Sequence, residues 1–258
     1  MTSDPHSAGL AAGYATALAG FLLAAHLRPG TWPRPSPPAI ARPWRELGLL
    51  AVAVVATLAV GQLYQHDLLL PRAGADAPDL SRSAFEAANQ IAIFSPLLLL
   101  IAWRGRPLRR HAWLPTDRLP ERLALGALLA ALAAAAFLAV RGDPERCVEL
   151  GRFVARPTRL HVAVQVLLED VAIAFAFVRI AAITGRPRLT AVAVGALFAA
   201  GHVPAMLADG AGVDRLLPLL RDAALASAVL LVLRRGADVW WFACVHTVLD
   251  LTQYFPRG

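Results

Sequence analysis

The chain alternates between apolar blocks about 20 residues long and short segments rich in arginine and proline. A helix of that length crosses about 30 Å of hydrocarbon. Composition agrees, since 57% of the residues are hydrophobic, 17% are charged and the mean hydropathy is +0.55. We therefore expect an all-α fold, a polytopic transmembrane bundle of about eight helices in the cell membrane. The expected helices are residues 8–27, 47–64, 84–103, 122–140, 161–183, 188–207, 215–233 and 237–254.

The fifth block breaks this pattern, because Glu169 and Asp170 stand side by side in an otherwise apolar run. Carboxylates at membrane depth are costly and usually serve a function, facing the bundle interior and a partner. Two later blocks offer such partners. One carries His202, four residues after Phe198, and the other carries His246 and Asp250. Since His246 and Asp250 are four residues apart, they share one helical face.

Topology predicts that these groups meet. Eight spans put both termini on one side of the membrane, and Glu169, His202, His246 and Asp250 then all lie within roughly 6–12 Å of that surface. The loops on the opposite side carry about 14 arginines and few acids. The positive-inside rule therefore places the four groups at the non-cytoplasmic surface.

The net charge is +7, and all 25 basic residues are arginines. Attraction of the loops to anionic membrane lipids accounts for this charge. No arginine cluster is interleaved with aromatic residues, so nucleic acid is not an expected partner. The two cysteines, Cys147 and Cys244, are far apart in the sequence, which argues against a disulfide framework or a cysteine-based metal site.

The residue types suit hydrolysis of a peptide bond. A carboxylate beside a histidine can take a proton from water and deliver it to a leaving amine. A second histidine can stabilise the oxyanion of the tetrahedral intermediate. Both histidines and an acid could instead bind zinc, as in sites with three protein ligands and a water. A proton-coupled transporter would also gather acids and histidines, although we find no inverted repeat.

Residues 161–254 resemble the CPBP family of intramembrane proteases, which includes the type II CAAX prenyl endopeptidases and bacteriocin-immunity relatives. The family pattern is Glu-Glu-x-x-x-Arg, then Phe-x-x-x-His, then His-x-x-x-Asn on successive helices. Here the second motif is Phe198 to His202, and the third is His246 to Asp250. Residues 1–160, with helices one to four and Pro/Arg-rich loops, match only in being membrane-spanning.

The resemblance implies that Glu169 and His202 activate water while His246 and Asp250 form the oxyanion site. It also implies a peptide or protein substrate, possibly lipidated, and no obligate metal cofactor. The first motif departs from the pattern, because the second acid is Asp170 and Ala174 occupies the arginine position. Arg179 is about 13 Å along the helix from Asp170. Arg179 is thus too far away to replace the missing arginine. Arg221 enters the bundle from the same side at about the same depth as Asp170, so we expect these two residues to pair. The lost arginine leaves open an inactive descendant that acts as a binding or immunity protein.

Overall fold

The computed structural model describes residues 5–32, 36–69, 71, 79–208 and 218–256, and these residues form helices without any strand. The longer helices are α1 (Pro5–Leu27), α2 (Pro43–Gln65), α3 (Asp79–Arg104), α5 (Leu119–Arg141), α7 (Leu160–Thr184), α8 (Pro187–Gly201), α11 (Pro218–Gly236) and α12 (Trp240–Leu251). The shorter ones are α4 (Leu108–Ala112), α6 (Cys147–Val154) and α9 (Val203–Ala208), with 3-10 turns at Pro144–Arg146, Pro157–Arg159 and Thr252–Tyr254. The all-α fold is confirmed.

Four of the described helices, α1, α2, α3 and α5, are long and apolar enough to cross a membrane. The eight spans expected from the sequence are not shown. Helix α8 has 15 residues and α12 has 12, which give lengths of about 22 and 18 Å against about 30 Å of hydrocarbon. Four helices thus have the length and composition of membrane spans, and α8 and α12 are shorter than their apolar patterns predicted.

The expected helix at 188–207 is interrupted at His202, where α8 ends and α9 begins. Proline lacks a backbone N–H and clashes with the carbonyl four residues earlier. Pro204 therefore explains why α8 does not continue. The other late helices differ from their expected bounds, since α11 continues to Gly236 and α12 spans Trp240–Leu251. Residues 215–217 of the expected seventh helix lie outside the described residues.

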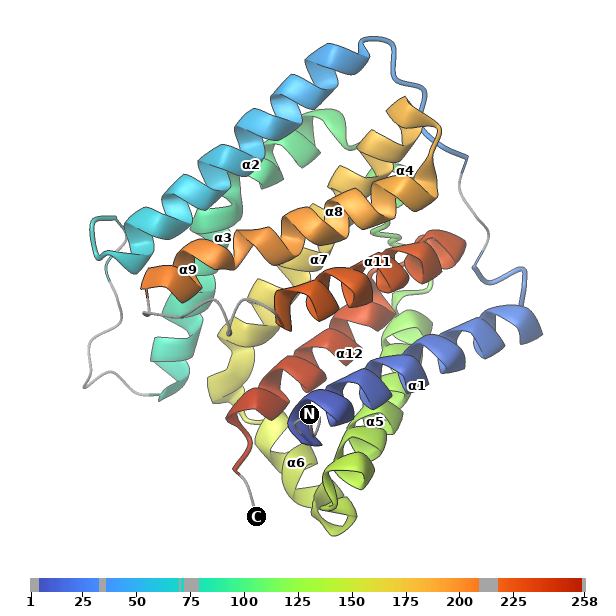
Figure 1. The fold of residues 1–258 in the computed structure, drawn as a ribbon, viewed down its shortest axis with the longest axis vertical. Helices are drawn as coiled ribbons and strands as arrows, with labels where there is room; N and C mark the ends of the chain where they lie inside the picture. The colour runs from blue at the N-terminus through green and yellow to red at the C-terminus, as the bar shows by residue number, and fades with distance from the viewer. Residues whose placement is uncertain (1–4, 33–35, 70, 72–78, 209–217, 257–258) are drawn as a thin grey trace.

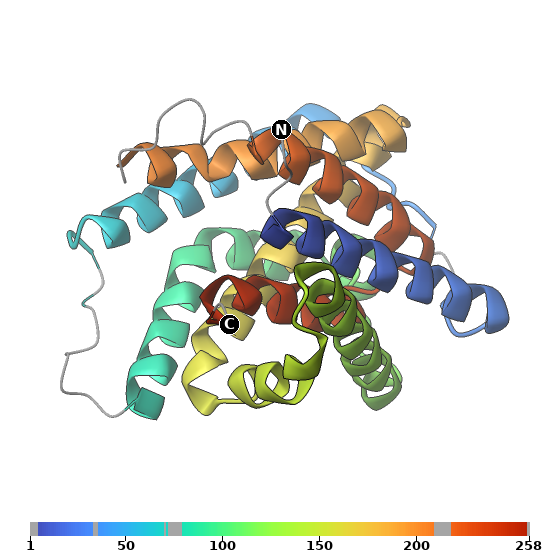
Figure 2. The same ribbon diagram turned by 60° about the horizontal axis from the view of Figure 1, so that its bottom comes forward.

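The long helices pack in two layers. One layer holds α2, α8, α11 and α1, and the other holds α3, α7, α12 and α5 (Figures 1 and 2). Helix α7 packs against α3 and α12 in its own layer and against α8 in the other. This central position brings the acids of α7 close to the helices that carry His202 and His246.

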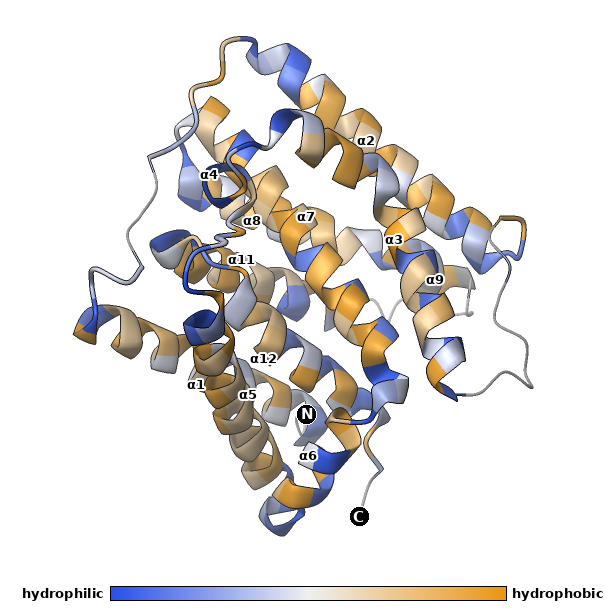
Figure 3. Ribbon diagram, turned by 180° about the vertical axis from the view of Figure 1, so that it is seen from behind, coloured by the Kyte–Doolittle hydropathy of each residue, from blue (hydrophilic) through white to orange (hydrophobic). Residues whose placement is uncertain are grey.

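Large apolar side chains cover the outside of α2, including Val52 (68% exposed), Val55 (64%) and Leu58 (46%). Figure 3 shows apolar residues along most of α2 and α5, with hydrophilic residues at the helix ends. A contiguous apolar surface of this kind is unusual for a monomer in water. It is the surface expected of a helix that faces lipid.

Close packing between α5 and α12 depends on Gly126. A Cβ atom at this position would lie 2.8 Å from Cys244 Sγ and 2.9 Å from Trp241 Cα. Real Cβ atoms do not approach backbone so closely, so the two helices can cross at this distance only over a glycine. Small residues serve the same purpose in membrane helix pairs generally.

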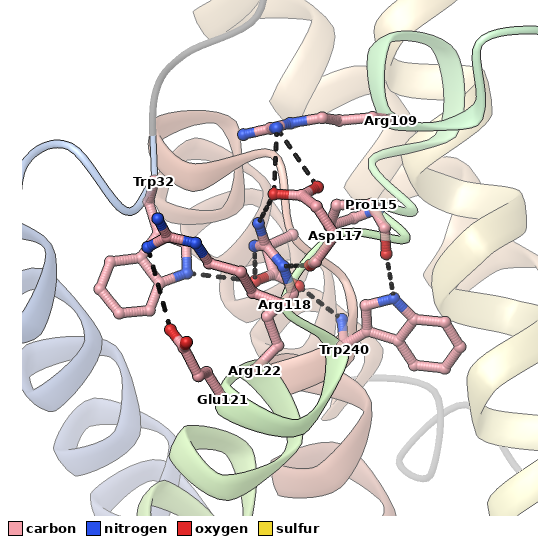
Figure 4. A network of polar contacts seen from close by, with 9 residues as sticks. Trp32, Arg109, Pro115, Asp117, Arg118, Glu121, Arg122 and Trp240 are labelled. Atoms are coloured by element: carbon pink, nitrogen blue, oxygen red, sulfur yellow. Dashed lines mark hydrogen bonds and ion pairs between the residues drawn. The ribbon is translucent and has the colours of Figure 1, made fainter.

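A buried ion pair joins the start of α5 to the start of α12 (Figure 4). Arg122 donates to Asp238 Oδ2 at 2.6 Å, and the two side chains are 1% and 0% exposed. Trp32 Nε1 donates to the same oxygen at 3.1 Å, and the Trp240 backbone N–H donates to Oδ1 at 3.0 Å. The carboxylate thus holds together segments that are far apart in the sequence.

Asp117 extends this network towards the surface. Burial acts to raise the pKa of the Asp117 carboxyl, but the hydrogen bond from Arg122 and the charges of Arg122 and Arg109 outweigh it, so the pKa lies below its ordinary value. The carboxylate therefore contributes to stability above its ordinary pKa. That contribution is lost as the pH falls through the lowered value.

We expect Asp238→Ala to lower the free energy of unfolding by about 3–5 kcal/mol, because it leaves the Arg122 guanidinium buried without its partner. Unfolding of the purified protein in detergent, followed by circular dichroism, measures the change. Glu121→Ala is the matched control, since Glu121 is exposed and lies 3.9 Å from Arg118. Its effect should stay within about 0.5 kcal/mol. Equal effects of the two variants would contradict a structural role for the buried pair.

Candidate functional site

Asp170 of α7 and His246 of α12 form the centre of the candidate site. The distance from His246 Nδ1 to Asp170 Oδ1 is 2.9 Å, and the side chains are 15% and 3% exposed. Buried valines lie next to both residues in the sequence, Val171 after Asp170 and Val245 before His246. Val166 is buried one helical turn before Asp170. With Asp170 as a carboxylate, Nδ1 donates the hydrogen bond and Nε2 remains available.

Glu169 precedes Asp170 on α7 and is less deeply buried. Its Oε1 accepts a hydrogen bond from Gln165 Nε2 at 2.9 Å, one helical turn earlier. Both His246 and His202 are close enough to interact electrostatically with this carboxylate. Asp170 of α7 and His246 of α12 are thus in direct contact, with Glu169 next to Asp170 on α7, and His202 reaches Glu169 only through a longer-range electrostatic interaction.

His202 follows the last residue of α8 and is exposed. Its ring packs edge-to-face against Phe198, with 4.9 Å between the ring centroids. This contact explains the Phe198–His202 spacing physically, because residues four apart meet on one helical face. Phe198 therefore positions the imidazole rather than taking part in chemistry itself.

Asp250 lies on the same helix as His246 but does not orient it. Asp250 Oδ1 accepts a hydrogen bond from Gln253 Nε2 at 2.6 Å, while the imidazole pairs with Asp170. Asp250 does interact electrostatically with both His246 and His202. The acid that orients His246 thus comes from another helix, not from the same helical face.

The sequence analysis missed Tyr14 of α1. Its ring centroid is 6.3 Å from that of His246, and Phe242 packs beside both rings at 6.2 and 5.5 Å. Tyr14 also interacts electrostatically with Glu169 and Asp170. The available signal was a hydroxyl-bearing aromatic in the middle of a helix composed mainly of alanine, glycine and leucine.

The expected ion pair between Asp170 and Arg221 is wrong. Arg221 pairs with its neighbour Asp222 at 3.1 Å, and both are well exposed, at 42% and 37%. Asp170 is paired with His246 instead. A neighbouring acid satisfies the arginine without any desolvation of its charge, so nothing drives it into the bundle.

Two further residues bear on the missing arginine of the first motif. Ala174 is completely buried in the apolar core, leaving no space for a guanidinium group. Arg179 points elsewhere, since it donates to Glu46 at 2.6 Å and to the Arg104 carbonyl. Asp170 Oδ2 is left without a hydrogen-bond partner among the described protein atoms.

A zinc site was the alternative interpretation of these residues. In the part of the chain that the structure describes, no three histidine, cysteine or acidic side chains are grouped so that they could hold a metal ion. The pairing of His246 Nδ1 with Asp170 also leaves only one nitrogen of that ring for any ligand. The described geometry fits an acid–base site better than a three-ligand site.

No protein-family model matches this chain, and no curated protein or solved structure matches it either.

The substitution Ala174→Arg would restore the arginine of the family motif. We expect it to lower the free energy of unfolding by about 1–3 kcal/mol or more, because the core has no room for the larger side chain. Thermal unfolding in detergent measures the loss. Ala174→Ser is the control, since it adds a single atom at the same buried position. An arginine variant as stable as wild type would mean that α7 can accommodate the motif and that the packing described here does not exclude it.

Proposed function

We propose that the protein is a CPBP-type intramembrane peptidase that hydrolyses a peptide bond close to one membrane surface. The observation that carries the proposal is the 2.9 Å hydrogen bond between Asp170 and His246, in the apolar interior and next in sequence to Glu169. Such groups are costly inside an apolar bundle and are usually kept for function. Their convergence with His202 is the second support.

In the proposed reaction, Glu169 takes a proton from water, and the hydroxide attacks the carbonyl carbon of the scissile bond. Gln165 holds one oxygen of the Glu169 carboxylate and leaves the other for the water. His202 assists from the end of α8. The carbon–nitrogen bond then breaks, and the leaving amine takes the proton that Glu169 had accepted.

His246 is the proposed oxyanion donor. Because Asp170 holds Nδ1, a protonated His246 donates from Nε2 to the negative oxygen of the tetrahedral intermediate. Asp170 therefore orients the imidazole, whereas the resemblance implied only that Asp250 forms the oxyanion site together with His246. Asp250 contributes through its charge, which acts on both histidines.

The proposed setting is the cell membrane, with the chain as a multi-pass protein of about eight helices. The eight long helices alternate in direction, and contacts such as Val239 N–H to the Trp113 carbonyl gather the arginine-rich loops at one end. The positive-inside rule makes that end cytoplasmic. The substrate is then a peptide or protein segment, possibly lipidated, that reaches the opposite surface.

We expect Glu169→Gln to reduce cleavage of a responsive peptide by about 10²–10⁴-fold, because the amide cannot accept the proton from water. The assay uses purified protein in lipid with a panel of prenylated and transmembrane-adjacent peptides, and mass spectrometry locates the cut. Glu145→Gln, the same change at an exposed position outside the site, is the control.

Two results would overturn the peptidase proposal. Cleavage by Glu169→Gln at the wild-type rate would remove the proposed base. Peptide binding without cleavage by the wild type, across the whole panel, would favour the inactive binding or immunity protein that the departure at Ala174 suggests. Proton flux through the protein in liposomes would favour a transporter instead.

The orienting role of Asp170 has its own test. We expect Asp170→Asn and His246→Gln each to lower the turnover number, and the double variant to be no slower than the slower single variant, because the pair acts as one unit. Turnover numbers of the two single variants and the double variant, measured on one peptide, complete the cycle. Additive losses would show that the two residues act separately.

A further inference from the structure

Two adjoining cavities lie at the end of the bundle opposite the candidate site. The first has a volume of about 360 Å³, and its lining includes Trp113, Phe177, Val178 and Ala181. The second, of about 460 Å³, is lined by Arg186, Pro187, Arg188, Leu189 and Arg234. Pro187 and Arg234 line both, so a mainly apolar space and a basic space adjoin at these two residues.

The three arginines of the second cavity are exposed, and none forms a side-chain hydrogen bond or ion pair with another described residue. The more buried arginines at this end do have partners. Arg122 binds Asp117 and Asp238, and Arg179 and Arg104 share Glu46. Glu46, Asp117 and Asp238 thus already have arginine partners. A counter-charge for Arg186, Arg188 and Arg234 has to come from outside the protein.

The backbone adds to this positive charge. Helix α8 begins at Pro187, with Arg186 as its N-cap residue and no side-chain cap. The first turn of a helix has N–H groups without intrahelical partners and carries the positive end of the helix dipole. An anion between the three guanidinium groups would therefore also meet the N-terminal end of α8.

The apolar cavity has a fixed wall formed by a proline-containing segment. Arg110 donates to the Ser36 carbonyl at 2.9 Å and to the Pro37 carbonyl at 2.6 Å. These bonds hold the segment over the C-terminal half of α7, where Ala181 and Ala182 leave space. The volume falls in the range of roughly 300–1,000 Å³ that small-molecule sites occupy.

We propose that these cavities bind one anionic phospholipid, with its phosphate between Arg186, Arg188 and Arg234 and part of an acyl chain against Phe177, Val178 and Ala181. Charge complementarity selects an anion, and the adjoining apolar space selects one with a hydrocarbon chain. Basic pockets between membrane helices on the cytoplasmic side bind acidic lipid head groups in this way. The site rests on membrane insertion of the chain but not on peptide hydrolysis.

The test is native mass spectrometry of the full chain, released from detergent containing equal amounts of phosphatidylglycerol and phosphatidylcholine. We expect wild type to retain one phosphatidylglycerol. In the triple variant Arg186→Gln, Arg188→Gln, Arg234→Gln, the preference for phosphatidylglycerol over phosphatidylcholine should fall at least about tenfold. The matched control is Arg28→Gln, Arg42→Gln, Arg45→Gln, which removes equal charge from exposed positions at the same end and should keep it.

Equal loss in the two triple variants would overturn the proposal, because it would show a general attraction to surface charge. If the triple variant fails to fold, the single variant Arg234→Gln replaces it in the test. This variant is expected to weaken phosphatidylglycerol binding several-fold. Melting temperatures of all variants identify that case.

A second arm separates a lipid from free phosphate. We expect Ala182→Phe, which fills the apolar cavity, to weaken retention of phosphatidylglycerol, and excess inorganic phosphate to displace the lipid poorly. Retention unchanged in Ala182→Phe, together with full displacement by phosphate, would mean a phosphate site without an acyl chain. Peptide cleavage is not the readout, so this proposal and the peptidase proposal can fail independently.

Discussion

The carboxylate of Asp238 is the contact on which the arrangement of the long helices depends. It receives hydrogen bonds from Arg122 of α5, Trp32 of the segment after α1 and the backbone of Trp240. Burial of an unpaired charge would cost several kcal/mol, so each donor must be in place when the bundle is closed. The start of α12 is therefore fixed relative to α5 and α1.

This constraint reaches the candidate site through the rigidity of α12. His246 lies eight residues beyond Asp238, a rise of about 12 Å in a helix, so the position of the ion pair sets the depth of the imidazole. Gly126 and Cys244 set the distance between α5 and α12 over the same stretch. The hydrogen bond from His246 to Asp170 then joins α12 to α7, next in sequence to Glu169.

The sequence predicted the parts of this arrangement that follow from hydrophobic length and helical spacing. The long helices and the Phe198–His202 contact follow from counting residues along apolar blocks. Helix ends were predicted less well. Pro204 sits in an apolar run that continues past it, and hydropathy does not register a missing N–H.

Partners across helices could not be predicted from spacing at all. Asp170 and Arg221 were expected to pair because they lie at similar depths, yet depth says nothing about which side of a helix faces the interior. Tyr14 was missed for the same reason, since α1 is apolar on every side. Only packing shows that this hydroxyl-bearing ring faces His246 rather than lipid.

The two ends of the bundle differ in how they handle charge, and this difference bears on both proposals. At the candidate site, Asp170 and His246 pair at 2.9 Å, which allows both to stay inside an apolar bundle. At the other end, the buried acids Glu46 and Asp238 pair with Arg104, Arg179 and Arg122. The exposed Arg186, Arg188 and Arg234 have no side-chain partner among the described residues. Such an excess is tolerated where water or lipid head groups supply the counter-charge. In the proposed multi-pass setting, the unpaired charge of the arginine-rich end would keep that end at the membrane surface, and the length of the helices would then set the depth of the acid–histidine site.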